Sequence, residues 1–277
     1  TARLYGLVKP LLYKCFTPLS LFNPAYWPLV TKIRAFESYW QIARKYFKSD
    51  KLCFAFTFEA MFMGVSPYQA PAFYSIITYT DHVQKIAHPM GGMYQIPLAL
   101  EKMAKKFGAK FYYNSEVKKI SGNGKVNLNV NGKDSFFDKV VVNADYSYAR
   151  EELLGERIKD YKYSCSVYLI YLGLKKKVKG VMHHNLFFAS DLDRNLREIF
   201  NDGIISEDPS FYIHVPTVTD EGLAPAGKDI FYILVPVANL AKAKGSLKDK
   251  EDIIRKVVFE KINKSLDINL EDLIEVE

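Results

Sequence analysis

The spacing of apolar residues predicts helices in the first third of the chain. Apolar residues recur at intervals of three and four through residues 31–47, which is the spacing of one apolar helix face. Residues 51–63 are nearly all apolar, as is typical of a buried helix, and Gly64 to Pro67 ends that run. Pro71 suits the first turn of another helix over residues 72–83.

A glycine turn opens the middle of the chain. Pro89-Met90-Gly91-Gly92 predicts a turn, and residues 93–107 then place apolar side chains on one helix face. Gly108 stands where a left-handed helix cap is needed. Strands are predicted next, at residues 110–114, 125–130 and 137–143.

Two of these strands carry further signals. Residues 125–130 alternate apolar with polar positions, which indicates a half-buried strand, and Asn131-Gly132 indicates a hairpin turn. Residues 137–143 run through Val140, Val141 and Val142, which is typical of a strand buried on both faces.

The last part of the chain alternates strands with loops. A closing helix is predicted over residues 249–266, where apolar residues recur in helical phase. We therefore expect an antiparallel sheet packed by helices. Its predicted strands are residues 164–174, 183–189, 210–215 and 229–235.

Composition narrows the class of protein. The 277 residues are 49% hydrophobic, which excludes a disordered chain. Aromatic residues make up 14%, which suits either a site for a long apolar molecule or an aromatic-rich core. The net charge of +7 comes without a recognisable nucleic-acid-binding module, so we expect an anionic membrane surface as partner and no nucleic acid.

The cysteines and the first 30 residues indicate where such a protein works. Cys15, Cys53 and Cys165 lie far apart, which indicates a reducing compartment and no thiolate metal site. Nothing in the sequence is long and apolar enough to span a bilayer. The first 30 residues interleave apolar and aromatic residues with Lys9 and Lys14. They suit either a segment in the membrane interface or a helix pair that covers the core. We expect a cytoplasmic protein with peripheral membrane association.

The histidines give no metal site by spacing. His183 and His184 are adjacent in a predicted strand, so we expect their side chains on opposite faces, unable to share one metal. His82, His88 and His214 have no carboxylate or thiol partner at ligand spacing. We therefore expect no bound metal.

Nine segments of the chain carry motifs that are informative when taken together and in order. They are residues 56–68, 88–93, 114–120, 141–146, 164–174, 208–210, 215–220, 223–227 and 234–240, and the most specific stretch begins at Asp208-Pro209-Ser210. In this order the segments resemble the bacterial phytoene desaturase family of flavin enzymes, within the wider amine-oxidase-like superfamily. The first 30 residues match least.

The resemblance implies a mixed α/β fold. It combines part of a Rossmann-type FAD domain with a substrate domain that has an antiparallel or mixed sheet and helices. Residues 1–90 would be the helical, membrane-facing part of the substrate domain. Residues 91–150 would be a middle segment of the FAD domain, and residues 151–277 the sheet-plus-helix part of the substrate domain.

Two features of the family are missing from this sequence. The family opens with a G-x-G-x-x-G loop for the flavin pyrophosphate and closes with a glycine-rich segment over the flavin ring. Neither occurs here, the first residues lack an initiator Met, and the last residues carry no stop signal. We expect an excised fragment that is inactive alone and binds FAD weakly or not at all.

The resemblance implies cofactor contacts at three places. The main chain at Glu116 and Val117 would approach the adenine, unless it only leads into a hairpin. Gly91 and Gly92 would pass near the flavin, unless they only form a turn. Ala144 would allow close approach beyond a strand end, while Asp145 serves equally well as a helix N-cap.

The resemblance also implies a substrate channel and a reaction. The FAD enzyme would introduce C=C bonds into a carotenoid precursor such as phytoene or dehydrosqualene. No catalytic residue is identified, and the oligomeric state is unassigned. The alternatives are a polyene or retinol saturase, an amine-oxidase-type enzyme, and a catalytically inactive lipid-binding domain. The candidate channel wall, which an ordinary core would explain equally well, is Phe54, Phe58, Met61, Phe62, Phe73, Tyr74 and Tyr79.

Overall fold

The largest sheet forms from segments in which apolar positions alternate with half-exposed ones. Its five strands run antiparallel in the order β5-β6-β7-β4-β8, which confirms the four predicted strands and adds β8. The computed structural model describes residues 2–9, 13, 14, 17, 22–24, 27–34, 36–122, 124–159, 161 and 163–277. The strands are β4 (Ser166–Leu174), β5 (His184–Phe187), β6 (Phe211–His214), β7 (Asp229–Val237) and β8 (Ile274–Val276).

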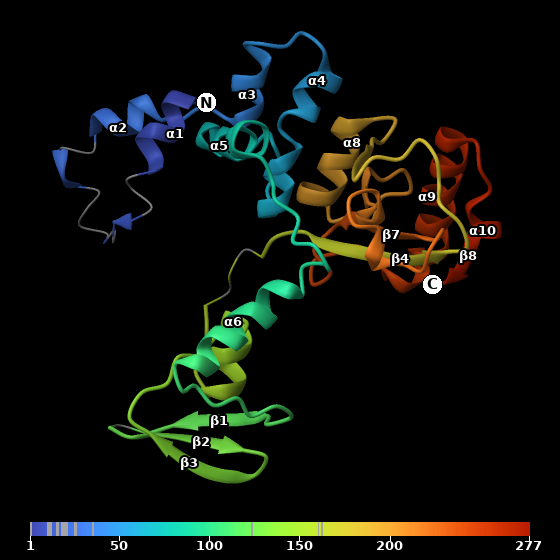
Figure 1. Ribbon diagram of the computed structural model, residues 1–277. Helices are drawn as coiled ribbons and strands as arrows, with labels where there is room; N and C mark the ends of the chain where they lie inside the picture. The colour runs from blue at the N-terminus through green and yellow to red at the C-terminus, as the bar shows by residue number, and fades with distance from the viewer. Residues whose placement is uncertain are drawn as a thin grey trace. The chain divides into compact units, whose positions relative to one another are not determined.

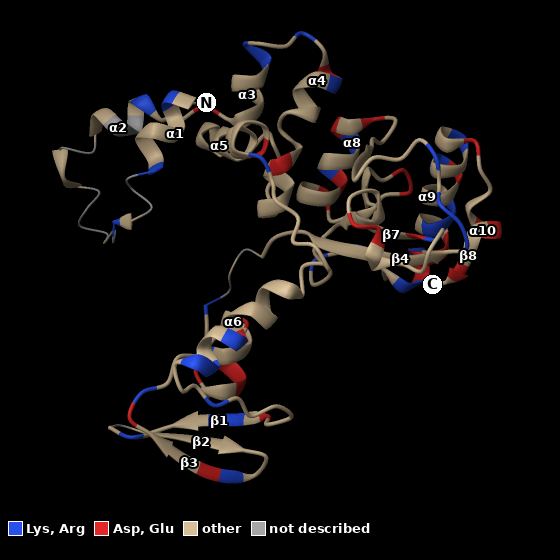
Figure 2. Ribbon diagram, viewed as in Figure 1, with Lys and Arg blue, Asp and Glu red and all other residues tan. Residues whose placement is uncertain are grey.

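One face of this sheet carries the main core. In β7, Phe231, Ile233 and Val235 are fully buried, while the residues between them are only half-buried. Helix α9 (Glu251–Leu266) lies along this face and inserts Val258 and Phe259 among the strand residues (Figure 1). Burying a large apolar side chain contributes about 1.5–3 kcal/mol, so this layer dominates the stability of the sheet. Figure 2 shows β4 and β7 almost free of charged residues.

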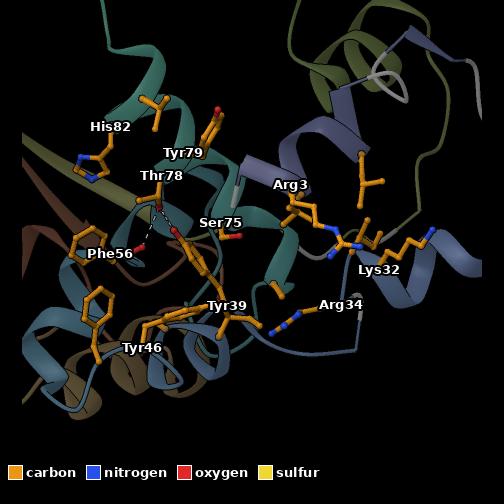
Figure 3. Close-up of a pocket in the computed structure, with 18 of the residues that line it drawn as sticks. Arg3, Lys32, Arg34, Tyr39, Tyr46, Phe56, Ser75, Thr78, Tyr79 and His82 are labelled. Carbon is orange, nitrogen blue, oxygen red and sulfur yellow. Dashed lines mark hydrogen bonds between the residues drawn. The ribbon is translucent and has the colours of Figure 1, made fainter.

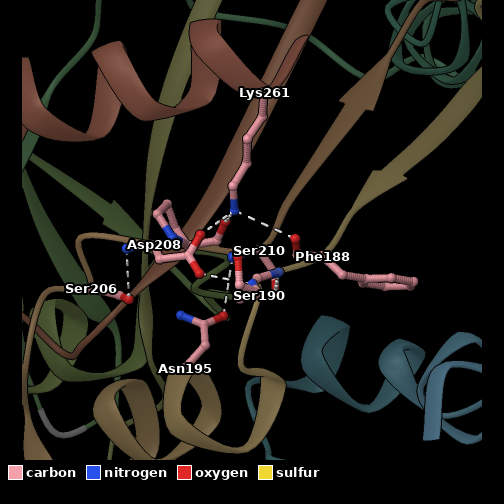
Figure 4. A network of polar contacts seen from close by, with 9 residues as sticks. Phe188, Ser190, Asn195, Ser206, Asp208, Ser210 and Lys261 are labelled. Atoms are coloured by element: carbon pink, nitrogen blue, oxygen red, sulfur yellow. Dashed lines mark hydrogen bonds and ion pairs between the residues drawn. The ribbon is translucent and has the colours of Figure 1, made fainter. Parts of the chain in front are cut away.

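A polar network fixes the start of β6 to α9 (Figure 4). Lys261 of α9 forms an ion pair with Asp208 and donates to the carbonyl oxygen of Pro209 at 3.0 Å. Asp208 also accepts from the N–H of Ser190 at 2.8 Å. Burial alone would raise the pKa of Asp208, but the hydrogen bonds from Lys261 and Ser190 outweigh it and hold the pKa low. Asn195 accepts from the N–H of Ser210 at 3.1 Å.

Short helices surround the sheet and differ in part from their prediction. The predicted helix over residues 31–47 is broken, because Ser38 and Gln41 form a capping box that starts a new helix. The predicted helices over 51–63 and 72–83 are confirmed as successive turns. The helices are α1 (Ala2–Val8), α2 (Trp27–Lys32), α3 (Tyr39–Arg44), α4 (Asp50–Ala55), the 3-10 helices Phe58–Met63 and Ala72–Tyr74, α5 (Ser75–Tyr79), the π-helix Thr80–Gln84, α8 (Leu192–Arg197) with the π-helix Glu198–Asp202, and α10 (Leu270–Leu273).

The chain divides into two compact units. The first joins Thr1–Gln95 with Tyr163–Glu277, and the second is Ile96–Lys162. The second unit contains nearly all of α6 (Gln95–Lys106), a three-stranded antiparallel sheet in the order β1-β2-β3, α7 (Tyr146–Tyr148) and the π-helix Ala149–Leu153. Its strands are β1 (Val117–Ser121), β2 (Val126–Val130) and β3 (Lys133–Phe137).

The second unit confirms some predictions and corrects others. α6 and the Asn131-Gly132 turn are confirmed, since Val130 pairs with Lys133 across those two residues. Residues 110–114 and 138–143, however, belong to no ladder. A strand buried on both faces needs neighbours on both sides. The described strands of this unit pair only with one another, so Val141 stays 94% exposed.

Candidate functional site

An apolar cavity of about 270 Å³ lies between the helical segment 54–62 and the second face of the large sheet. Phe54 of α4 makes an edge-on ring contact with Phe188, the residue after β5, at 5.0 Å between centroids. None of the described residues that line the cavity carries a charge. They are Phe54, Phe58, Met61, Phe62, Cys165, Val167, Leu186, Phe187, Phe188, Ser210, Phe211, Tyr212, Leu234 and Pro236. Four residues of the predicted channel wall therefore share one cavity.

Strand pairing makes the floor of this cavity continuous. Leu186, Tyr212 and Leu234 are direct neighbours across β5, β6 and β7. They face away from the α9 core, since side chains alternate between the two faces of a sheet. Val167 of β4 lies opposite Pro236 of β7 and extends the same floor.

The same face becomes polar two residues further along each strand. His184, His214 and Tyr232 are neighbours across β5, β6 and β7. Tyr171 of β4 pairs with Tyr232, with 5.1 Å between ring centroids. His184 Nδ1 lies 2.6 Å from the hydroxyl of Tyr212, so the polar end of the floor touches the cavity lining directly.

Four histidines gather at this polar end. The Nε2 atoms of His183 and His214 lie 2.8 Å apart, and the His183 ring centroid lies 4.5 Å from that of His184 and 5.3 Å from that of His88. The expectation of opposite faces for His183 and His184 is wrong. Strand β5 begins only at His184, so His183 does not follow the strand alternation. Sequence spacing could not show this cluster, because its members come from three separate segments.

Burial lowers the pKa of His183, His184 and His214. Desolvation, reinforced by His183 and then by His184 and His88, lowers the pKa of His214 to about 4. Desolvation also lowers the pKa of His183 and of His184. Within the part of the chain that is described, no group of three or more side chains has the arrangement of a metal site.

Asp220 joins the histidines to the glycine turn. Its carboxylate accepts from the N–H of Gly91 at 2.5 Å and lies 3.7 Å from Nε2 of His88. Gly91 and Gly92 have φ of +85° and +87°, and a Cβ on Gly92 would lie 3.2 Å from Leu223. Close packing within the chain therefore accounts for both glycines. Asp220 belongs to the matching segment at residues 215–220, but the sequence alone did not predict its contacts with Gly91 and His88.

The second unit holds the other predicted cofactor residues. The N–H of Glu116 donates to Asn131 Oδ1 at 3.2 Å, and its carbonyl accepts from the N–H of Asn131 at 3.0 Å. The main chain of Glu116 is thus already paired, while Val117 begins β1 and is half-buried.

Ala144 and Asp145 follow a segment that forms no strand here. Asp145 caps α7, because its Oδ1 accepts from the N–H of Tyr148 at 3.0 Å. Ala144 is small and exposed. Residues 138–144 belong to no described ladder and, apart from the half-buried Val140, are exposed.

A larger cavity of about 970 Å³ lies among α1, α2, α3 and α5. Figure 3 shows Arg3, Lys32 and Arg34 on one side of it, opposite Phe56 and His82. Tyr79, from the predicted channel wall, lines this cavity and lies 5.1 Å from the ring of Tyr5.

Phe73 and Tyr74 line neither of the two cavities. Their rings lie edge to face at 4.9 Å between centroids. Tyr74 packs on a small core around Tyr39 and Ala60. For Tyr74, the structure therefore shows the ordinary core packing that the sequence left open.

A buried carboxyl lies beside the larger cavity. Glu59 is 2% exposed and accepts hydrogen bonds from the hydroxyls of Tyr39, at 3.1 Å, and Thr78. Burial raises the pKa of Glu59, against the opposing effect of these two hydroxyls. The group joins the 3-10 helix Phe58–Met63 to α3 and α5. Sequence reasoning missed it, because the glutamate lies in an otherwise apolar run.

The first 30 residues are described only in part. α1 packs on α5 and places Leu4 and Leu7 in the wall of the larger cavity. Residues 10–12, 15, 16, 18–21, 25 and 26, which belong to the predicted interfacial segment, lie outside the described residues. Within the described part, no helix combines the length and apolar character that crossing a membrane requires.

Curated relatives point to one group of enzymes. The chain is 38% identical over 217 residues to a zeta-carotene-forming phytoene desaturase of Myxococcus xanthus, covering 75% of this chain and 42% of that protein. It is 35% identical over 269 residues to a phytoene desaturase of Phycomyces blakesleeanus, covering 91% and 46%. It is 33% identical over 207 residues to a 4,4'-diapophytoene desaturase of a Methylomonas species, covering 70% and 40%. The chain spans less than half the length of these relatives.

Solved structures agree on the fold. An oxidoreductase from Methanosarcina mazei matches with a TM-score of 0.54 at 18% identity, covering 91% of this chain and 58% of that one. A putrescine oxidase variant matches with a TM-score of 0.51 at 10% identity, covering 89% and 53%. The mixed α/β fold predicted from the sequence is confirmed. The family model described as flavin containing amine oxidoreductase matches residues 21–201, well over half of the chain. The chain belongs to the family of flavin-containing amine oxidoreductases.

Proposed function

We propose that the complete protein is an FAD-dependent desaturase that introduces C=C bonds into a long polyene precursor such as phytoene or dehydrosqualene. The support comes from relatives that are phytoene and diapophytoene desaturases and from the family of this chain. The chain covers less than half of those relatives, so the activity is proposed for the complete protein.

The observation that carries the proposal is the uncharged cavity between the helical segment 54–62 and the sheet. Hydrocarbon substrates need shape and the absence of charge, because an unpaired charge is costly in an apolar compartment. Phe54, Phe58 and Met61 meet Val167 and Leu234 across it, so its walls come from two distant parts of the sequence. Together they exclude water from whatever lies between.

The residues present fit a partial contact with FAD. The exposed Ala144 is a place where a cofactor can meet the backbone. When bound, the flavin supplies the hydride acceptor for the desaturation. Because the chain has no G-x-G-x-x-G loop, we propose that by itself it binds FAD weakly or not at all and is inactive.

We also propose that the complete protein works at a membrane surface. The walls of the larger cavity are mostly apolar, and Arg3, Lys32 and Arg34 stand together on one side. Cations near an anionic leaflet contribute about 1 kcal/mol each, and the adjoining apolar wall suits a lipid-dissolved substrate. Sedimentation with anionic and neutral vesicles tests this, since only the anionic ones should retain the protein.

The test of function uses the complete flavoprotein with phytoene or dehydrosqualene in liposomes. We expect a longer conjugated chromophore, detected by absorbance and chromatography. Val167→Asp places a charge in the cavity lining and should lower turnover at least about tenfold, since the carboxylate must be desolvated by the substrate. Phe136→Asp, on an exposed position of β3, is the matched control.

The outcomes separate the alternatives. A colourless protein with bound lipid supports an inactive lipid-binding domain and overturns the enzyme. A yellow protein that saturates the polyene, or oxidises only amines, overturns the desaturase while keeping the flavoenzyme. Equal turnover by Val167→Asp and wild type would show that this cavity does not hold the substrate.

A further inference from the structure

Desaturation requires a proton acceptor that the cavity lining does not supply. Two neighbouring carbons lose a hydride and a proton, and the described residues around the cavity carry no carboxylate, lysine or histidine. We infer that His183 and His214 form a proton-sharing pair that accepts the proton released from the substrate. This inference rests on the proposed function.

The distance between the two rings fixes how many protons they share. With 2.8 Å between the Nε2 atoms of His183 and His214, one nitrogen must donate and the other accept. Two bare nitrogens would repel each other, and two N–H groups would clash. The pair therefore holds one proton between the rings and can take up one more at an Nδ1 atom without breaking the bond.

Thr219 can pair with either form of His183. Its hydroxyl lies 2.5 Å from Nδ1 of His183. A hydroxyl both donates and accepts, so Thr219 can pair with His183 whether that nitrogen is bare or protonated. Once the pair has taken up its extra proton, both Nδ1 atoms carry hydrogen, and the shared proton can move between the two Nε2 atoms while Thr219 accepts from Nδ1 of His183.

The groups around His183 and His214 keep the pair neutral and therefore able to accept a proton. His184 stacks on His214 with 5.6 Å between centroids, and Tyr232 approaches His214 from β7 at 6.3 Å. Three strands contribute titratable groups that face the pair: His184 from β5, Tyr212 from β6 and Tyr232 from β7. His88, from the segment before the glycine turn, and Asp220, from the loop after β6, face it from outside the strands. Asp81 acts on His184. The low pKa of His214 makes it neutral at pH 7.

The pair lies where the reacting carbons would pass. Its same-face neighbours on β6 and β7 are Tyr212 and Leu234, which line the cavity, about 7 Å along the strands. On its other side, His88 and Asp220 lead to Gly91. A polyene that extends from the cavity toward the glycine turn would cross these rings.

The chemistry suits a weak base. Loss of the hydride with its electron pair leaves positive charge on one substrate carbon. The neighbouring C–H is then acidic, and its bonding electrons become the new π bond as the proton moves to an imidazole nitrogen. A neutral imidazole of low pKa is a strong enough base to remove a proton from such an acidic C–H. The imidazolium then releases its proton to solvent at the half-exposed end of the cluster.

The first test uses this chain alone and needs no flavin. Nitrogen-15 NMR of histidine-labelled protein should show a through-bond nitrogen–nitrogen coupling between His183 and His214, and uptake of one proton by the pair as a unit. His214→Gln should abolish the coupling. Lys256→Gln, an exposed position of α9, is the control and should leave it intact. Two rings that titrate independently, without coupling, would overturn the inference.

The second test uses the complete flavoprotein and its pH profile. General-base catalysis typically contributes 10²–10⁴-fold, so His214→Gln should lower turnover roughly 100-fold and remove the loss of activity at acid pH. The Lys256→Gln control should keep both. Turnover and pH profile unchanged in His214→Gln and in His183→Gln would refute the pair while the desaturase stands. No turnover by a flavin-loaded wild type would instead refute the proposed function.

Discussion

The carboxylate of Asp220 accepts a hydrogen bond from the main-chain N–H of Gly91, across 129 positions of sequence, with 2.5 Å between oxygen and nitrogen. A second bond, from the N–H of Gly222 at 3.2 Å, holds the other oxygen. Asp220 is 5% exposed, and its loss removes the acceptor of two part-buried hydrogen bonds. Asp220→Ala should therefore destabilise the larger unit by about 1–3 kcal/mol in urea unfolding.

A neighbouring residue supplies the control for that measurement. Glu221 is exposed and makes only a surface ion pair with Lys177. Glu221→Ala should change the free energy of unfolding by less than about 1 kcal/mol. Equal losses for the two variants would show that the Asp220 bonds contribute nothing specific.

The carboxyl of Glu59 should give the unfolding midpoint a distinct pH dependence. Burial raises its pKa in the folded chain, so the folded state favours the neutral acid. The stabilisation that neutral Glu59 gives to the folded state is complete below the ordinary carboxyl pKa. It is lost as the pH rises through the pKa of Glu59 in the folded chain. The midpoint of wild type relative to Glu59→Gln should fall as the pH rises over that range. A difference that stays constant with pH would contradict the raised pKa.

The thiol of Cys165 reports on occupancy of the apolar cavity. Burial raises its pKa, so a maleimide should react slowly at pH 7 and faster as the pH increases. In a Cys15→Ser, Cys53→Ala background, a bound polyene should slow labelling at least about tenfold by covering the lining. In a Lys256→Cys variant, the thiol at this exposed position should be labelled at the same rate with and without polyene. Equal rates with and without polyene would show that the cavity is not the binding compartment.

The ion pair of Lys261 with Asp208 should be measurable in stability. Lys261→Met keeps the aliphatic stem but removes the ion pair of Asp208 and the side-chain donor of the Pro209 carbonyl. We expect a loss of about 1–3 kcal/mol in urea unfolding. Lys256→Met on the same helix, paired only with Glu260 at 3.9 Å, should cost less than about 1 kcal/mol. Similar values for both would mean that the network in Figure 4 adds no stability.

The sequence predicted the elements whose signals are local. The strand at residues 229–235, the Asn131-Gly132 turn and the apolar phase of residues 249–266 each depend on residues within one segment, and each is confirmed. The helix break at Ser38 was also a local signal, a capping box with Gln41, but the apolar spacing of residues 31–47 obscured it.

The remaining features depend on partners far away in the sequence. Residues 138–143 have the composition of a buried strand and belong to no described ladder, since pairing is decided by a neighbour and not by the segment itself. The four channel residues Phe54, Phe58, Met61 and Phe62 share a cavity, whereas Phe73 and Tyr74 do not line it; apolar composition alone could not separate the two groups. The contact of His183 with His214 spans 31 positions and depends on the pairing of β5 with β6, although His183 itself precedes β5.

The two faces of the large sheet have different roles, since one packs against α9 and the other lines the cavity. Phe231 and Ile233 pack toward α9, while Leu234 lines the cavity and Tyr232 lies on the same face as Leu234. Substitutions on the cavity face can therefore reshape what the compartment accepts without weakening the layer that keeps the sheet folded. A lineage carrying this arrangement can change the lining of the cavity while its thermal stability is retained, because adjacent residues are under different selective demands.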